Sequence, residues 1–194
     1  MTSKENTVIT IEPIVFPVLA FSFFALPLKW IFGWLVAIAV HECCHYIALC
    51  FFGVQVWKVQ IGFCGVKMQT DSMSLFPEFI CALAGPLGSS LLFLLSKQFP
   101  YVAVCAFAHC VFNLLPVRTM DGGRMLRCIV SLFFRDETAE TVCRIIGIAI
   151  QCLLVISILF LFVKGVISIA FALPVLYLVI HFISREKHLA KTAK

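Results

Sequence analysis

Two histidines four residues apart flank a glutamate in the segment His41-Glu42-Cys43-Cys44-His45. In a helix, residues at i and i+4 lie on one face about one turn apart, so both imidazoles can reach a single zinc ion. Glu42 is rotated about 100° from His41 and can reach a water molecule at the metal without being a ligand. The segment predicts a metal site in which His41 and His45 are ligands and Glu42 is a general base. The alternative is a set of polar side chains hydrogen-bonded inside a helix bundle.

A catalytic zinc ion has three protein ligands and an open position, so a third ligand must come from elsewhere in the chain. The best candidate is Asp121, which follows a helix-breaking Pro116 and precedes a glycine pair. Helical rise places His41 and Asp121 at the same depth within a turn or two, roughly 12 Å from the inner membrane face. The alternative for Asp121 is a turn carboxylate, because Asp-Gly pairs are common in turns. The amide of Asn113 is suited either to the backbone carbonyl that Pro116 leaves without a donor or to a substrate.

Other metal-binding side chains in apolar segments are interpreted as packing residues. Cys44 lies next to His45, and a small buried hydrophobe is favoured over a competing thiolate ligand. His109 and His181 are single histidines in apolar stretches, and both are interpreted as hydrogen-bonded core residues. The ten cysteines lie mostly in apolar runs and predict free thiols rather than a disulfide framework.

The elements that must position these residues are membrane helices. Of the 194 residues, 62% are apolar and 13% are charged, and the mean hydropathy is +1.05. Soluble domains carry about 25% charged residues, so the composition predicts a polytopic membrane protein. The uncharged or nearly uncharged stretches are 13–28, 30–57, 79–96, 98–117, 145–163 and 165–184.

These stretches predict an all-α membrane protein with about six transmembrane helices. Partial alternation over 54–70, together with Gly62 and Gly65, predicts a short β-hairpin between the second and third helices. We expect one polytopic membrane domain over 1–194, with a catalytic core at about 29–135 and additional helices at 145–163 and 165–184. The first stretch could be a signal peptide, but its flanks lack a basic region and a clear cleavage site, so a retained span is expected.

The lysines and arginines predict the orientation. With a cytoplasmic N-terminus, only Lys29, Lys97 and Lys164 lie outside. The inner side then carries twelve basic residues: Lys4, Lys58, Lys67, Arg118, Arg124, Arg127, Arg135, Arg144, Arg185, Lys187, Lys191 and Lys194. This asymmetry predicts that both termini are cytoplasmic. The lysines and arginines lie at the ends of apolar stretches, where a membrane sorts them, so the positive net charge does not indicate nucleic-acid binding.

One basic helical face combines Arg124, Arg127, Ser131 and Arg135 in the segment after the fourth apolar stretch. It predicts a helix along the inner membrane surface. Contact with anionic lipid and simple interfacial anchoring are equally compatible with this pattern.

The order of motifs resembles the site-2 protease family of intramembrane zinc metalloproteases. His-Glu-x-x-His in one membrane helix is followed by Ala84-Gly85-Pro86 and then by Asn-x-x-Pro-x-x-x-x-Asp-Gly from Asn113 to Gly122. The similarity covers residues 41 to about 124, and the six-helix minimal form is most similar to sporulation-type members. Family members often have proline or apolar residues at the positions of Arg118 and Thr119, so this chain departs from the pattern there.

The resemblance implies one zinc ion bound by His41, His45 and Asp121, with Glu42 as general base and Asn113 as an oxyanion or substrate contact. It implies hydrolysis of a peptide bond in a membrane-embedded or membrane-tethered protein near the cytoplasmic face, in the cell membrane, with a regulatory membrane partner as a further expectation. The alternative is a non-enzymatic membrane protein, either a metal-ion carrier or a scaffold that binds helices. Zinc enzymes that trim prenylated or misfolded proteins resemble a different architecture, whose third ligand is a glutamate in a second motif that is absent after His45.

Overall fold

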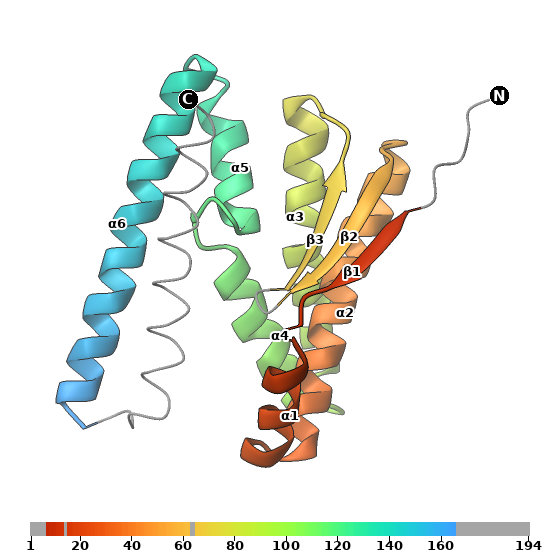
Figure 1. Ribbon diagram of the computed structural model, residues 1–194, viewed down its shortest axis with the longest axis vertical. Coiled ribbons are helices and arrows are strands. Elements are labelled where there is room, and N and C mark those ends of the chain that lie inside the picture. Colours follow the sequence, from red (N-terminus) through yellow and green to blue (C-terminus); the bar gives the residue numbers. More distant parts are fainter. Residues whose placement is uncertain (1–6, 14, 63–64, 166–194) are drawn as a thin grey trace. The chain divides into compact units, whose positions relative to one another are not determined.

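The computed structural model describes residues 7–13, 15–62 and 65–165. These residues form two compact units, one ending at Asn113 and the other beginning at Leu114. The described part of the first unit contains four α-helices, a short 3-10 helix and three strands, and the described part of the second contains two helices. Figure 1 labels these elements, which are described unit by unit.

Helix α2 (Leu28–Phe51) is the central element of the first unit. It begins directly after Pro27, whose extended backbone cannot continue a preceding helix. It ends at Phe51, two residues before Gly53, whose φ of 66° lies in the left-handed region that favours glycine. The amide of Val54 donates to the carbonyl of Leu49 at 3.0 Å and closes the last turn.

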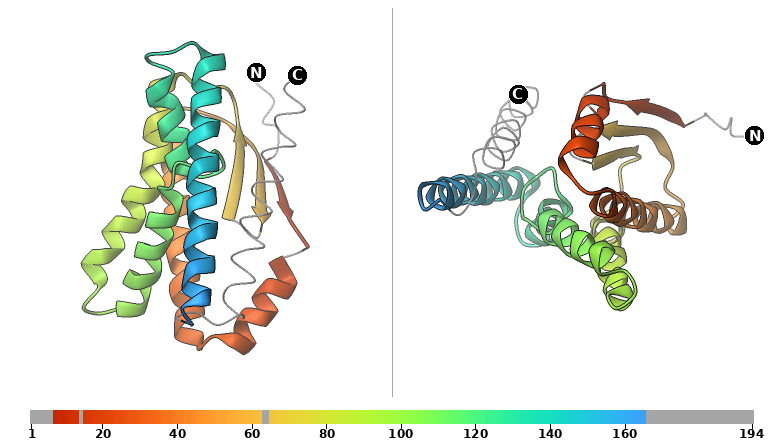
Figure 2. Two further views of the ribbon diagram at one scale, coloured as in Figure 1. Left: turned by 90° about the vertical axis from the view of Figure 1, so that its left-hand side faces the viewer. Right: turned by 90° about the horizontal axis from the view of Figure 1, so that it is seen from below.

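Helices α3 (Leu75–Leu91) and α4 (Pro100–Asn113) both pack against α2 and against each other, with the 3-10 helix η1 (Leu92–Leu95) between them in sequence. Figure 2 shows this arrangement from two further directions. A buried cluster at the contact contains Ala37, Leu92, Val102, Cys105 and Ala106. The small residues among them, Ala37, Cys105 and Ala106, let the helix backbones approach closely, as in other membrane helix pairs.

A three-stranded sheet completes the first unit, with β1 (Val8–Ile11), β2 (Val56–Gly62) and β3 (Gly65–Thr70) in that spatial order. Strands β2 and β3 pair antiparallel, with Ile61 opposite Val66, and confirm the hairpin predicted over 54–70. Strand β1 was not predicted; it pairs parallel to β2, with Ile9 opposite Val59. The outer edge of β2 is therefore covered by the chain's own N-terminal segment.

The second unit contains α5 (Asp121–Val130) and α6 (Asp136–Val163), which pack against each other. Before α5, a turn is closed by the Met120 amide, which donates to the Val117 carbonyl at 2.8 Å. The predicted basic helix is present as α5, but it ends at Val130, so Ser131 and Arg135 lie beyond it. The break predicted near Pro116 is confirmed, because α4 ends at Asn113.

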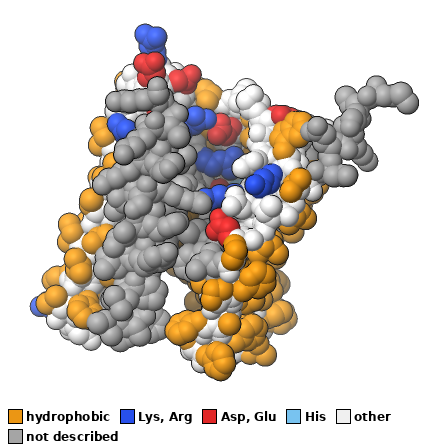
Figure 3. Space-filling view, in the orientation of Figure 1, with side chains coloured by type: hydrophobic (Ala, Val, Ile, Leu, Met, Phe, Trp, Pro, Cys, Tyr) orange, Lys and Arg blue, Asp and Glu red, His pale blue; other side chains and the backbone are white. Residues whose placement is uncertain are grey.

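Within the described residues, three helical segments are long and apolar enough to cross a membrane: α2, the continuous stretch Leu75–Leu95, and α6. They indicate an integral membrane protein with a mainly helical fold. Hydrophobic side chains cover the visible surface over α1 (Val15–Ala25) and the adjoining part of α2 (Figure 3). Such exposed apolar surface matches a lipid environment.

The six predicted spans are not all confirmed. Helix α1 has 11 residues and α4 has 14, shorter than the roughly 20 that a perpendicular span needs. The three prolines at positions 13, 17 and 27 limit the first helix, which ends before Pro27. The last predicted span, 165–184, lies outside the described residues except for Gly165.

Candidate metal centre

His41 and His45 lie on the buried face of α2, with 1% and 8% of their surface exposed. Their Nε2 atoms face each other at 3.0 Å. The i, i+4 spacing produces this geometry directly, because both side chains project from the same face of the helix. Two imidazole nitrogens that converge on one point are the first requirement for a shared metal ion.

The other nitrogen of each ring is held by helix α3. His45 Nδ1 donates to the carbonyl of Cys81 at 2.6 Å, so the proton lies on Nδ1 and Nε2 keeps a lone pair. His41 Nδ1 lies 2.9 Å from the hydroxyl of Ser89. Histidine ligands of zinc characteristically have such a partner on the second nitrogen, which fixes the tautomer and the ring plane.

Gly85 provides the space beside the two rings. A Cβ atom at this position would overlap the Nε2 atoms of both His45 and His41. Glycine in the middle of a helix costs about 1 kcal/mol relative to alanine, so its presence here has a structural cause. The motif Ala84-Gly85-Pro86 lies where α3 packs against α2, and the contact at Gly85 is with the histidine pair.

This arrangement fits a zinc ion. Zinc–nitrogen distances of about 2.0–2.1 Å and tetrahedral angles put two ligand nitrogens about 3.3–3.4 Å apart. A small rotation of either ring would increase the observed Nε2–Nε2 separation of 3.0 Å to that value. The rings, their anchored Nδ1 atoms and the space left by Gly85 therefore form half of a tetrahedral site.

Glu42 is half-buried and is turned away from the histidine face toward the hairpin. The amide of Val66 donates to its Oε1 at 3.3 Å. The Val66 N–H therefore points away from β2, toward the other edge of β3. The glutamate and the outward edge of β3 are thus neighbours within the first unit.

His109 is more closely associated with the site than the sequence indicated. Its ring packs edge-to-face on that of His41, with centroids 4.6 Å apart, and on Trp34 at 5.9 Å. Asn113 Nδ2 lies 3.1 Å from His109 Nε2 and donates to the His109 carbonyl at 3.0 Å. The amide of Asn113 therefore makes a local hydrogen bond at the end of α4 and also orients the ring that covers His41.

Asp121 belongs to the second unit, where it is the first residue of α5 and is 8% exposed. A carboxylate is favoured at this position by the helix dipole. Its Oδ1 lies 4.0 Å from Arg124, at the limit of an ion pair. Arg118, one of the two residues that depart from the family pattern, pairs with Glu140 of α6.

Gly122 and Gly123 hold the start of α5 against the preceding turn. A Cβ atom at these positions would overlap the carbonyl oxygens of Leu114 and Val117, respectively. The glycine pair therefore sets the backbone path that carries Asp121 into α5. The three predicted ligands are all buried and are of residue types that bind metal ions.

Comparison with known proteins identifies the fold. No protein-family model matches the chain, and no curated protein matches it by sequence. Among solved structures, the chain is similar to the site-2 protease from Methanocaldococcus jannaschii, with a TM-score of 0.63 and 23% sequence identity. The match covers 88% of this chain and 86% of the protease. The chain therefore has the fold of a site-2 protease, which supports the relationship indicated by the three motifs.

Proposed function

We propose that this protein is an intramembrane zinc metalloprotease that hydrolyses a peptide bond of a membrane-embedded or membrane-tethered protein. The observation that carries the proposal is the buried pair His41 and His45, whose Nε2 atoms converge while α3 holds their Nδ1 atoms. Zinc is the metal that best fits two neutral imidazoles and one carboxylate. The fold of a site-2 protease provides independent support.

The proposed ligands are His41, His45 and Asp121, and together they leave one coordination position open. A bound zinc ion would supply Lewis-acid activation of a water molecule and of the substrate carbonyl. Glu42 accepts the proton of the attacking water and transfers it to the leaving amine. Asn113 stabilises the developing oxyanion or holds the substrate, in competition with its hydrogen bond to the His109 carbonyl.

The substrate segment is proposed to add as a strand to the outward edge of β3. A peptide bond inside a helix hides its carbonyl in hydrogen bonds, so the substrate must be extended before attack. Within the described residues, β2 is the strand neighbour of β3, and the other edge of β2 is covered by β1. Strand addition at β3 would place the substrate backbone beside Glu42, because the Val66 amide already contacts that carboxylate.

The proposed location is the cell membrane, with both termini in the cytoplasm and the product released there. Water must reach the histidines, so a polar path from the cytoplasmic side is required. A regulatory membrane partner would control access to this path. These features rest on the distribution of basic residues and on the resemblance to the family.

The test compares the purified full-length wild-type protein with Glu42→Gln and His45→Ala in detergent. Bound zinc is quantified for each, and cleavage is assayed on a panel of single-span peptides with cytoplasmic tails. Glu137→Gln is the matched control, because Glu137 is an exposed carboxylate in the first turn of α6. We expect zinc in the wild type, Glu42→Gln and the control, loss of zinc in His45→Ala, and cleavage by the wild type and the control alone.

Absence of zinc from the wild-type protein would overturn the proposal and favour a scaffold. Zinc with unimpaired cleavage by Glu42→Gln would retain a metalloenzyme but remove Glu42 from the role of base. Zinc transport into proteoliposomes without peptide cleavage would favour the ion carrier.

A further inference from the structure

A cavity of about 150 Å³ lies within the second unit, between α5, the turn that precedes it and the first turns of α6. Four arginines line it: Arg118 from the turn, Arg124 and Arg127 from α5, and Arg144 from α6. Its acidic lining residue is Glu140. The volume far exceeds the roughly 10–15 Å³ that one water molecule needs on a comparable measure.

The lining carries a net positive charge. Arginine stays protonated in proteins, so four positive charges surround the cavity against the single negative charge of Glu140. Arg118 is paired with Glu140, and Arg124 has the carboxylate of Asp121 at 4.0 Å. Bringing four guanidinium groups from three segments around one space is unfavourable unless anions lie among them, and Glu140 and Asp121 together supply two negative charges against four positive ones.

The geometry favours a phosphate group. Guanidinium groups bind phosphate oxygens through paired N–H donors, and their planar shape matches this anion better than a lysine does. The spacing of Arg124 and Arg127, three residues apart on α5, puts both on one helix face. Arg144 approaches from a different helix, so the arrangement differs from a single solvated basic face.

The place of Arg144 along α6 indicates where the cavity lies relative to the membrane surface. Arg144 immediately precedes the uncharged run 145–163, which has a helical length of about 28 Å. This length matches the roughly 30 Å hydrocarbon thickness of a bilayer. Large apolar side chains along the run are exposed, including Ile145, Leu153 and Ile156 at 61–63%. Arg144 and the cavity therefore lie at the level of lipid headgroups when this run crosses the bilayer.

We propose that this cavity is a binding site for a phosphate-bearing anion, supplied by the headgroup of an anionic lipid at the cytoplasmic surface. Arg127 and Arg144 bind the phosphate oxygens from opposite helices, and the Arg118–Glu140 pair closes the side of the site next to the turn. The bound headgroup then joins α5 to the start of α6. The lining includes none of the proposed catalytic or metal-binding residues, although Arg124 lies 4.0 Å from Asp121, and lipid binding at this site does not depend on protease activity.

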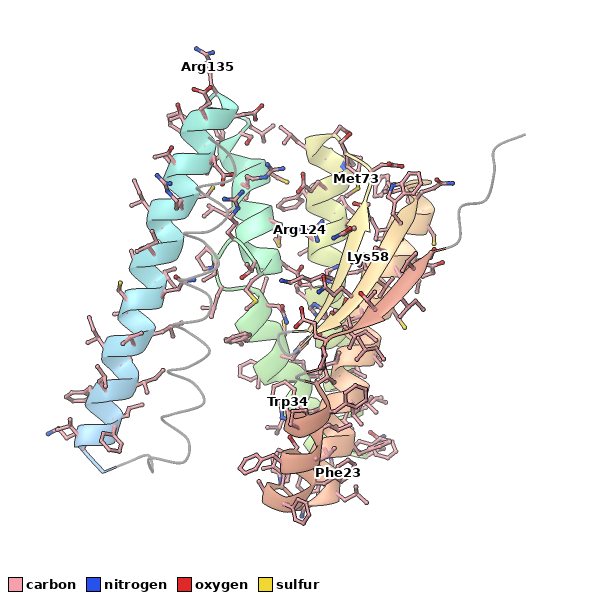
Figure 4. The ribbon with its side chains drawn as sticks, in the orientation of Figure 1. Phe23, Trp34, Lys58, Met73, Arg124 and Arg135 are labelled. Carbon is pink, nitrogen blue, oxygen red and sulfur yellow. The ribbon has the colours of Figure 1, made fainter. Side chains whose placement is uncertain are left out.

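The experiment measures lipid binding to the full-length protein by native mass spectrometry in detergent. The probes are short-chain phosphatidic acid, short-chain phosphatidylcholine and inorganic phosphate. The variants are Arg127→Gln, Arg144→Gln and Arg144→Lys, and the control is Arg135→Gln. Arg135 is exposed immediately before α6 and does not line the cavity, whereas Arg124 lies on α5 (Figure 4).

We expect phosphatidic acid to bind in preference to phosphatidylcholine. Binding is expected to weaken about tenfold in Arg127→Gln and Arg144→Gln, to a smaller extent in Arg144→Lys, and not in the control. Competition by inorganic phosphate would support the same site. Binding of inorganic phosphate without the lipid would support the phosphate site but assign its ligand to the free anion.

Two results would overturn the proposal. One is equal weakening by Arg135→Gln and Arg144→Gln, which would indicate a diffuse attraction to the basic surface. The other is equal binding of the anionic and zwitterionic lipids by the wild-type protein. A melting temperature measured for each variant separates loss of the site from loss of the fold, and Arg127→Gln tests the site independently of α6.

Discussion

At the scale of single residues, the orientation of the two imidazoles depends on atoms that belong to another helix. The Ser89 hydroxyl is fully buried and lies 2.9 Å from His41 Nδ1, whereas the backbone carbonyl of Cys81 accepts a hydrogen bond from His45 Nδ1. The carbonyl is present whatever side chain Cys81 carries. Mutation of Ser89 therefore removes the hydrogen-bond partner of His41 and leaves the partner of His45 in place.

We expect Ser89→Ala to lower zinc affinity about 10- to 100-fold, the usual effect of removing the partner of a ligand histidine. The zinc dissociation constant is measured by competition with a chromophoric chelator. Ser90→Ala is the matched control, since Ser90 is exposed and donates to the Leu87 carbonyl of its own helix. Equal affinities of the two variants would show that the Ser89 contact does not support the metal.

The substitution Gly85→Ala tests whether the space beside the two imidazole rings is needed for zinc binding. The added methyl group would overlap both Nε2 atoms, so the rings must turn away from each other. We expect bound zinc and cleavage to be lost together, while the melting temperature of the protein changes little. The control is Ala84→Ser, which adds one atom at the neighbouring position. Stoichiometric zinc in Gly85→Ala would contradict the proposed geometry.

At the scale of elements, the hairpin brings a strand edge to the helix that carries the motif. The Val66 amide points away from β2 toward Glu42, so the Met68 amide, two residues further along β3, faces the same side. We expect Met68→Pro to reduce cleavage strongly by removing one donor from this edge, with zinc content unchanged. Val8→Pro is the control at the opposite edge, because proline is tolerated as the first residue of a strand. Cleavage by Met68→Pro at the wild-type rate would exclude substrate addition at β3.

The elements that could be predicted are those with local signals. The His-Glu-x-x-His spacing depends only on helical periodicity, and the β2–β3 hairpin depends on alternation and two glycines within one short stretch. Strand β1 has four residues and pairs with a partner about 50 residues away, so no local pattern reveals it. The same reason applies to Ser89, the Cys81 carbonyl and His109, which reach the histidines from other helices.

At the scale of the whole molecule, the length of α6 and the charges at its two ends determine how this helix crosses a bilayer. Helix α6 has 28 residues, a length of about 42 Å, which exceeds the hydrocarbon thickness of about 30 Å. Basic residues flank it at Arg135 and Lys164. The distribution of lysine and arginine predicts that the Arg135 end is cytoplasmic and the Lys164 end is outside.

We therefore expect opposite labelling of the two ends of α6 by a membrane-impermeant maleimide in intact cells. Lys164→Cys is expected to react from outside, whereas Arg135→Cys reacts only after the cells are opened. The wild-type protein is the control for the native thiols, several of which are exposed in the described residues. Labelling of both positions from the same side would mean that α6 does not cross the membrane. Labelling with reversed sides would place the arginine cavity at the outer surface, where the membrane offers less anionic lipid, and would reverse the proposed direction of product release.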